Sequence, residues 1–415
     1  MQKTLYCGAA EKGRDVYVTI IEQARAMQNY IAEFHHDIHM HPELGFQEFR
    51  TMERLLGEIE PLGLPVKRYD PTGFHVDIKG NLPDNGLIVG LRSDLDALPV
   101  TETPNAKYRS VTEGVMHACG HDANQSMLLG ALKILASRRN GFAGTVRCLF
   151  QPAEELGRGG KLVMEQGACD GVSMYFGMHV AAETPNCAIG YNPGRMGAAV
   201  SEFHIRLTGK GAPGSQPERG VDAGVAACEI CAALQTIVSR RVNPQDPAVL
   251  TISYIKAGES NVNFIPARAE IIGNCRWFSK ELTEKLPVWI REIVAGICQT
   301  YGVTFEIDYD FRIAPLECDP KAVDIAMQSV HEVLGADAKT FVFGPIMASE
   351  DFSWLAHTVP SAYLEIGCGL DSGMTHSNEF HSSDECLPYG AAIFATEALK
   401  ALKYLASQQE GGASE

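Results

Sequence analysis

The chain has 415 residues, 45% of them hydrophobic, and its charged residues sum to a net charge of −16. This size predicts two or three folded domains of about 100–200 residues each and excludes a largely disordered chain. The acidic balance disfavours nucleic acid and anionic membrane surfaces as partners, and the sequence shows neither an apolar run of membrane-spanning length nor a secretory signal.

The first part of the chain predicts an α/β arrangement. Apolar residues recur at helical spacing over residues 18–40 and over Ser126–Ser137, so we expect a helix in each place. Leu87–Leu91 and Val146–Phe150 are short apolar runs bounded by turn residues, which is typical of buried strands. Strands that alternate with helices indicate a sheet flanked by helices.

The middle of the chain predicts a second, smaller unit with the order β-α-β-β-α-β, the split pattern of a ferredoxin-like domain. In chain order the expected elements are Phe203–Leu207, Asp222–Arg241, Val249–Ile255, Ala269–Phe278, Lys280–Tyr301 and Val303–Tyr309. The α/β pattern then resumes with a helix near Lys321–Leu334, a strand at Ser361–Ile366 and a helix at Gly390–Ala406, before a polar tail, Gln408–Glu415, that we expect to fray.

We therefore expect one α/β domain, made of residues 1–197 and 314–415, whose mixed and largely parallel sheet is flanked by helices. A ferredoxin-like domain is inserted at residues 198–313. The 12 cysteines are scattered through the chain, which indicates reduced thiols and a cytoplasmic protein. Cys228 and Cys231 have CxxC spacing, but they lie in a predicted helix without a second pair, so helix packing is favoured over a redox or zinc role.

The densest group of chemically active residues is 117–122, with the sequence HACGHD. In an extended segment the side chains of Cys119 and His121 would share a face and reach one metal ion. Asp122 or another nearby acid would orient His121 through its second ring nitrogen. A buried thiol beside a hydrogen-bonded histidine explains this motif equally well when it is taken alone.

Two adjacent carboxylates, Glu154 and Glu155, follow a predicted buried strand. One of them can bind a metal while the other faces a water molecule, which suits metal-assisted hydrolysis because the free carboxylate takes the proton of the water. A solvated acidic turn or a helix N-terminus is the alternative. His179 and His376, each unremarkable alone, complete a set of N, O and S donors that suits one or two borderline transition metals.

At these residues the sequence resembles the aminoacylase/carboxypeptidase-type metallohydrolases, and within them the branch of hippurate hydrolase and the auxin-conjugate amidohydrolases. The matching stretches run from about residue 30 to 390. They are residues 39–46 (HMHPELGF), 92–100 (RSDLDALPV), 117–122 (HACGHD), 127–130 (MLLG), 150–155 (FQPAEE), 177–180 (GMHV), 239–244 (SRRVNP), 263–266 (NFIP), 349–352 (SEDF) and 375–377 (THS).

The resemblance implies a catalytic α/β domain with a lid that commonly forms the subunit interface, and hence a homo-oligomer. It assigns the general base to Glu154 and places Asn263 and Arg276 of the lid near the carboxylate of a small substrate, a task that suits the arginine fork. The metal would be Mn, Zn, Co or Ni, in one or two positions. The ligands that the resemblance implies are Cys119, His121, Glu155, His179 and His376.

The sequence departs from the family pattern at two places. Pro213 and Glu218 stand where the lid motif of the family has histidines, and Asn124 stands where a histidine usually follows the His-Asp pair. The first lid histidine would stabilise the oxyanion at the scissile carbonyl, and losing one such donor typically costs about 10²–10³ in rate. Proline supplies neither a side-chain donor nor a backbone N–H.

Three interpretations remain. The first is an amidohydrolase that cleaves an N-acyl or N-aroyl amino acid, with another group, such as His204, replacing the lid histidine. The second is an aminohydrolase that releases ammonia from an activated aromatic amine such as 5-nitroanthranilate, where the ring takes up the negative charge. The third, a non-catalytic metal-dependent binding protein, is disfavoured because Glu154 is kept beside the complete ligand set.

Overall fold

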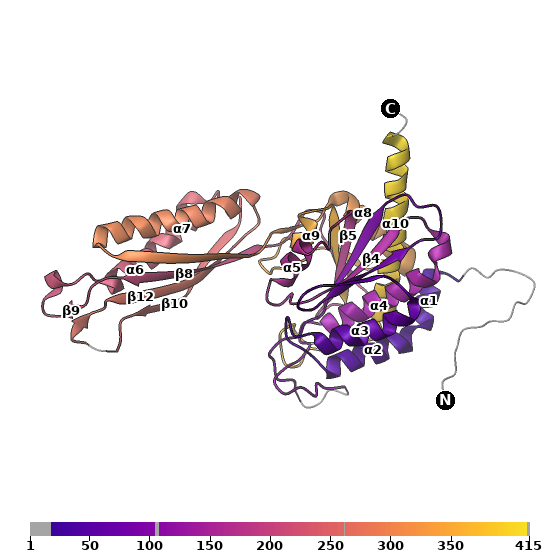
Figure 1. Cartoon of the computed structure of the whole chain (residues 1–415), viewed down its shortest axis with the longest axis horizontal. Helices are drawn as coiled ribbons and strands as arrows, with labels where there is room; N and C mark the ends of the chain where they lie inside the picture. The colour runs from indigo at the N-terminus through magenta and orange to yellow at the C-terminus, as the bar shows by residue number, and fades with distance from the viewer. Residues whose placement is uncertain (1–17, 104–107, 261, 413–415) are drawn as a thin grey trace, which may run out of the picture.

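The computed structural model describes residues 18–103, 108–260 and 262–412, and Figure 1 shows that they form two units. Each unit has its own hydrophobic core. One core is built from residues between Ala24 and Met196 and between Leu316 and Leu402, and the other from residues between Ala199 and Val303. We keep boundaries at residues 197/198 and 313/314 as a proposal, and refer to the inserted unit as the lid.

The larger unit is built on an eight-stranded sheet with the order β1-β2-β4-β3-β5-β16-β6-β15. Its central strands β4, β3, β5 and β16 are parallel, while β1, β2 and β6 make antiparallel pairs, so the sheet is mixed and largely parallel as expected. The strands are β1 (Val66–Arg68), β2 (Phe74–Lys79), β3 (Ile88–Asp94), β4 (Thr145–Gln151), β5 (Val172–Ala181), β6 (Ile189–Tyr191), β15 (Thr340–Val342) and β16 (Ser361–Gly367).

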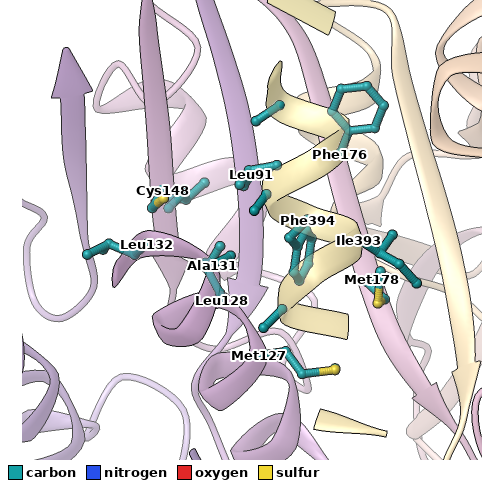
Figure 2. Close-up of a cluster of buried hydrophobic side chains, with 14 of the residues drawn as sticks. Leu91, Met127, Leu128, Ala131, Leu132, Cys148, Phe176, Met178, Ile393 and Phe394 are labelled. Carbon is teal, nitrogen blue, oxygen red and sulfur yellow. The ribbon is translucent and has the colours of Figure 1, made fainter. Parts of the chain in front are cut away.

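Helices flank this sheet. Figure 2 shows the core where α4 and α10 pack on it: Leu91 and Phe176 of the sheet meet Leu128 and Phe394 of the helices. The short strands β7 (Arg195–Gly197) and β14 (Leu316–Glu317) pair antiparallel near the connection to the lid. The helices are α1 (Ile20–Ala26), α2 (Gln28–Met40), α3 (Phe49–Ile59), α4 (His121–Ser137), α5 (Gly159–Glu165), α8 (Pro320–Leu334), α9 (Ser353–Ala356) and α10 (Leu387–Gly412).

The lid has the predicted ferredoxin-like order. Its four-stranded antiparallel sheet has the order β10-β12-β8-β13, and the apolar side chains of α6 and α7 pack on it to form the second core. The short strands β9 and β11 pair with one another, and β9 lies at the end of the lid remote from the larger unit (Figure 1). The elements are β8 (Ala199–Thr208), β9 (Ala212–Pro213), α6 (Ala223–Thr236), β10 (Ala248–Ala257), β11 (Phe264–Ile265), β12 (Arg268–Trp277), α7 (Lys280–Tyr301) and β13 (Thr304–Ile313).

The structure corrects the expectation of an extended segment around Cys119 and His121. Helix α4 begins at His121 rather than near Ser126, and Gly120 before it is left-handed with φ 93°. A side chain at Gly120 would collide with Val180, at 2.3 Å. Glycine adopts this conformation without a steric penalty, so the chain turns sharply between the two residues. The first turns of α4 are buried on every side, and such burial removes the apolar periodicity that marks an amphipathic helix.

Other differences are smaller. Helix 18–40 is interrupted at Met27, which separates α1 from α2. The tail predicted to fray remains helical, because α10 continues to Gly412, and the rest of the tail lies outside the described residues. Cys231 packs against the lid core, whereas Cys228 is exposed and so does not pack as expected.

One stretch of helix among the described residues, Ala223–Arg241, is long and apolar enough to cross a membrane by length and composition. It comprises α6 and the π-helical turn Ile237–Arg241. Its inner face, including Ala226, Ile230 and Leu234, packs on the lid sheet, as a core helix of this composition does.

Candidate metal centre

The structure brings the six predicted residues of the metal site together from four parts of the larger unit. Cys119 and His121 flank Gly120 at the start of α4, and Glu154 and Glu155 follow β4. His179 lies near the end of β5, and His376 lies in the loop between β16 and α10. Three overlapping groups have donor atoms within 4.8 Å of one another: Cys119, His121 and His179; Cys119, Glu155 and His376; and His121, Glu154 and Glu155.

One ring nitrogen of His121 is hydrogen-bonded to the backbone, and the other faces the candidate metal site. Its Nδ1 lies 2.9 Å from the backbone carbonyl oxygen of Asp96, and since a carbonyl only accepts, Nδ1 carries the proton. Nε2 is then unprotonated and carries a lone pair. It is fully buried, has no hydrogen-bond partner among the described residues, and lies 3.9 Å from Oε1 of Glu155. A buried lone pair aimed at carboxylates is what a metal-binding histidine presents.

His179 is arranged in the same way. Its Nδ1 donates to the carbonyl of Val180 at 2.7 Å, which leaves Nε2 facing the Sγ of Cys119 at 3.6 Å. His376 is more exposed, and its Nε2 lies 3.5 Å from Oε1 of Glu155, a buried oxygen for which residues 18–103, 108–260 and 262–412 also supply no hydrogen-bond partner. His376 has a positive φ of 64°, a backbone conformation that non-glycine residues seldom adopt.

The two carboxylates are aimed by the backbone around them. Ala153 has φ 51°, so β4 ends in a sharp turn immediately before them. The amide N–H groups of Glu154 and Glu155 donate to the two carboxylate oxygens of Asp96, each at 3.0 Å. Asp96 thereby fixes the histidine at the start of α4 and the carboxylates after β4 relative to one another.

Glu154 lies in a strongly acidic and buried environment. Burial raises its pKa well above the ordinary value, and the neighbouring charges of Glu350, Asp351 and Glu155 raise it further. The buried Arg92 guanidinium offsets part of this charge, because it lies 2.8 Å from Asp94 and 3.0 Å from both Glu350 and Asp351. A carboxylate with a raised pKa is a better proton acceptor than an ordinary one.

The sequence predicted that Asp122 or another nearby acid orients His121, and Asp122 does not. Its Oδ2 accepts a hydrogen bond from Nδ1 of His39 at 2.7 Å and lies 3.0 Å from Nε2 of His35. Asp96 takes the orienting role instead. Asn124, where the family has histidine, is fully buried: it donates to Asp94 at 2.9 Å and accepts the backbone N–H of Val180 at 3.1 Å.

The donor set fits a divalent transition metal. Two imidazole lone pairs, a thiol and carboxylate oxygens converge, and both Nε2 of His121 and Oε1 of Glu155 are buried atoms without a hydrogen-bond partner in the described part of the chain. Buried polar atoms without partners are costly, so their convergence at one point indicates an ion between them. Soft and borderline donors of this kind suit Zn, Mn, Co or Ni rather than Ca or Mg.

A cavity of about 800 Å³ opens over these residues, between the larger unit and the base of the lid. Arg276 of β12 lines it, and its Nη1 donates to the carbonyl of Met347 at 2.6 Å. Charged and polar side chains alternate with apolar ones around the cavity. Phe341, Phe343, Ile346 and Met374 supply much of the apolar part.

Three lid residues that the sequence analysis singled out lie away from the cavity of the same chain. Asn263 precedes β11 and, with Pro213, belongs to the remote end of the lid, where its carbonyl accepts the N–H of Gly214 at 2.8 Å (Figure 1). Residues 268 to 276 of β12 alone span about 26 Å, so Asn263 and Arg276 do not meet within one chain. His204 bonds Glu270 at 2.7 Å and Arg206 at 2.9 Å, and it does not belong to the described lining of the cavity.

Several residues at the site were not predicted from the sequence. Asp96 and Arg92 belong to a stretch noted only for its resemblance, and Glu350, Tyr363 and Glu365 line the cavity from segments far along the chain. The signal for Arg92 and Asp94 was present, since charged residues continue a buried apolar strand and therefore require partners.

Comparisons with known proteins agree with this geometry. The family model "Peptidase family M20/M25/M40" matches residues 90–400. The N-acyl-L-amino acid amidohydrolase of Geobacillus stearothermophilus is 38% identical, with 68% of this chain and 78% of the relative covered. The IAA-amino acid hydrolase ILR1-like 2 of Arabidopsis thaliana is 32% identical, with 96% and 92% covered.

Among solved structures, a dinuclear metal-binding peptidase of the M20 family from Bacillus subtilis is 31% identical with a TM-score of 0.78, and the match covers 91% of this chain and 99% of that one. The similarity extends through both the larger unit and the lid, so it includes the sheet, the lid and the segments that carry the clustered donors. The predicted resemblance is thereby confirmed: the chain belongs to peptidase family M20/M25/M40 and is a metal-dependent hydrolase of C–N bonds.

Proposed function

We propose that this protein is an amidohydrolase that cleaves N-acyl or N-aroyl amino acids, with Glu154 as general base. The observation that carries the proposal is the position of Glu154: it lies beside the convergent set of metal donors, 4.0 Å from the Nε2 of His121, and lines the cavity. The proposed ligands are Cys119, His121, Glu155, His179 and His376, with one or two ions of Mn, Zn, Co or Ni.

The chain's own residues account for the movement of the proton. When bound, the ion supplies Lewis-acid activation of a water molecule. Glu154 accepts the proton as water oxygen adds to the carbonyl carbon, and the raised pKa of its carboxyl makes it an effective acceptor. As the C–N bond breaks, Glu154 returns the proton to the departing nitrogen. Asp96 holds the backbone amide of Glu154 throughout, at 3.0 Å.

Arg276 is proposed to bind the carboxylate of the substrate. It reaches the cavity from the base of the lid, and its fork matches a carboxylate. The cavity volume of about 800 Å³ suits a small molecule. Asn263 would join the site only from the lid of a second copy, which agrees with the expected homo-oligomer. The lid offers an edge for it: β10 is an edge strand of the lid sheet as far as the structure describes the chain, and it exposes Val249, Tyr254 and Ile255.

A second candidate is an aminohydrolase that replaces an aromatic amine by hydroxyl and releases ammonia, with 5-nitroanthranilate as a representative substrate. Pro213 favours it, because its exposed ring offers no hydrogen-bond donor where an oxyanion donor is expected. An electron-poor ring takes up the charge that develops during attack and needs no such donor.

We further propose a cytoplasmic location. The eleven cysteines that the structure describes are all free, as expected in a reducing compartment. Partners are expected to be a small carboxylate-bearing substrate and a second copy of the chain, and neither nucleic acid nor membrane.

The test separates the two activities by their products. The purified protein is loaded with Mn²⁺, Co²⁺ or Zn²⁺ and incubated with N-acyl and N-aroyl amino acids, and in parallel with aminobenzoates that carry electron-withdrawing groups. Release of an intact amino acid supports the amidohydrolase. Ammonia with an amino-to-hydroxyl mass change supports the aminohydrolase instead, and no release from either panel by the loaded enzyme contradicts both.

A further inference from the structure

One row of the central sheet runs from the metal centre into the cavity wall. Glu365 of β16 pairs with His179 of β5 on one side and with Gly190 of β6 on the other, and Gly190 pairs with Phe341 of β15. Residues paired across neighbouring strands direct their side chains to the same face of a sheet. The row therefore presents an imidazole, a carboxyl, a gap and an aromatic ring in that order. Neighbouring strands are about 4.8 Å apart, so the carboxyl lies one strand from the metal ligand.

The gap at Gly190 is filled by aromatic rings. A Cβ built at Gly190 would lie 2.9 Å from Cζ of Phe341 and 3.1 Å from Cδ1 of Phe343, so both rings rest on the glycine backbone. His179, Glu365, Phe341 and Phe343 all line the 800 Å³ cavity. The Glu365 carboxyl is therefore next to an aromatic wall on the side away from the metal centre.

Contacts among the described residues do not account for the position of Glu365. No group in the described part of the chain donates a hydrogen bond to its carboxyl, and no described cation pairs with it. Burial alone raises its pKa to about 7. A partly buried carboxyl without a donor, on a strand that is otherwise buried, is unfavourable compared with an apolar residue of the same size. A ligand in the cavity can supply the missing donor.

We propose that Glu365, with Phe341 and Phe343, forms a specificity subsite for an aromatic acyl group that carries an N–H or O–H donor. The ring of the substrate packs against the two phenylalanines, and its amino or hydroxyl group donates to Glu365. This proposal rests on the proposed amidohydrolase function and specifies its substrate class. An aminoaroyl or hydroxyaroyl amino acid is preferred to an unsubstituted aroyl amino acid. Arg276, across the cavity, takes the carboxylate of the amino acid.

The test compares N-benzoylglycine with the three isomeric N-(aminobenzoyl)glycines, in the wild type and in E365L and E365Q. The wild type is expected to prefer one amino isomer by about tenfold or more in kcat/KM, because a site built to receive a donor discriminates against the analogue that lacks it. E365L is expected to bring that ratio to within about twofold, because the amino isomer loses its hydrogen-bond acceptor. E365Q, which keeps an acceptor oxygen, is expected to fall between the two.

E33L, a carboxyl-to-leucine change on the exposed side of α2, is the matched control and leaves the ratio unchanged. A wild type that shows no preference among the isomers, or an E365L variant that retains it, overturns the subsite. Failure of the proposed amidohydrolase reaction is recognised separately, because no benzoyl or aminobenzoyl substrate is then cleaved. The subsite is in that case tested by calorimetric binding of the aminobenzoates against benzoate: tighter binding of one amino isomer that E365L abolishes supports it, and equal binding contradicts it.

Discussion

The backbone carbonyl of Asp96 accepts the Nδ1 proton of His121 at 2.9 Å, and this contact decides which ring nitrogen of the histidine is free. The carboxylate of the same Asp96 receives the amides of Glu154 and Glu155 at 3.0 Å each. Asp96, in the segment that follows β3, thus holds both the start of α4 and the turn after β4. The donors converge because the polypeptide around them is fixed, before any ion is bound.

Replacing Asp96 should therefore weaken metal binding although Asp96 is not a proposed ligand. In D96A the carbonyl remains but the two amides lose their acceptor, so the turn that carries Glu154 and Glu155 is released. Partners of metal ligands typically contribute about 10–100-fold in affinity or activity. Competition with a metal-binding dye measures the change. Affinity equal to that of the wild type would show that the turn is held by other contacts.

Glu154→Gln separates proton transfer from metal binding. The amide keeps the shape of the side chain but cannot accept a proton, so turnover is expected to fall by about 10²–10⁴. Metal content, measured by elemental analysis of the purified variant, is expected to match the wild type. Persistent turnover would contradict the assignment of Glu154, and joint loss of metal and activity would assign it as a ligand instead.

Arg276→Ala should act on the affinity for substrate. A charge-assisted pair with the carboxylate predicts that KM rises on the order of 10–100-fold. Arg276 also donates to the carbonyl of Met347 at 2.6 Å, so a structural effect of the substitution has to be separated from the loss of the carboxylate contact. The paired measurement uses the carboxamide analogue of the substrate, whose KM should change little. An equal rise for acid and amide would indicate that Arg276 serves the lid rather than the carboxylate.

The sequence predicted the elements of the lid well, because each is long and has a clear period. Helix Lys280–Tyr301 matches α7, and strand Ala269–Phe278 matches β12 to within one residue. The start of α4 was missed because burial on all sides leaves no polar face to mark a helical period, and because a left-handed Gly120 gives no signal in hydrophobicity.

The candidate ligands were recognisable from their chemistry, but their supports were not. Asp96 acts through its backbone carbonyl and through accepted amides, and such contacts depend on where β3, β4 and α4 meet. Glu365 is conspicuous only once β16 and β6 are paired, since its neighbours Gly190 and Phe341 are far away in sequence. Asn263 was expected beside Arg276, and the length of β12 separates them within one chain.

Glu58 links three helices and provides a test of stability against pH. Its carboxylate accepts hydrogen bonds from Tyr30 of α2, Arg54 of α3 and Lys133 of α4. Although burial acts in the opposite sense, these bonds lower the pKa of Glu58 from 4.5 to about 2. Because the folded-state pKa is the lower one, the carboxylate stabilises the fold above pH 4.5, and this stabilisation is lost as the pH falls toward 2.

E58Q should accordingly melt below the wild type at pH 7, by about 2–4 °C for each kcal/mol lost. The difference should shrink as the pH is lowered from 4.5 toward 2, where the wild type also becomes neutral at this position. Calorimetry across that range checks it, with E53Q as the control because Glu53 pairs with Arg68 at the exposed surface. A difference that does not depend on pH would mean that shape rather than charge holds the three helices.

Glu397 of α10 should have the opposite dependence. Its side chain is fully buried, both carboxyl oxygens lack a hydrogen-bond partner among the described residues, and burial raises its pKa well above 4.5. The folded protein therefore keeps the proton that the unfolded chain releases, and stability falls by about 1.4 kcal/mol for each pH unit above the unfolded-state pKa until the folded-state pKa is reached.

E397M removes the carboxyl and keeps a similar volume, so it should raise Tm, and by more at pH 8 than at pH 5. The comparison with E397Q separates the causes. Glutamine removes the titration at position 397 but leaves a buried polar group without partners, so the Tm of E397Q should lie below that of E397M. The difference in Tm between these two variants should not change with pH over this range. Thermal melts of the three proteins at both pH values check this order. A lower Tm for E397M at pH 8 would show that Glu397 is paired in the folded protein and that its carboxyl contributes to the packing of α10.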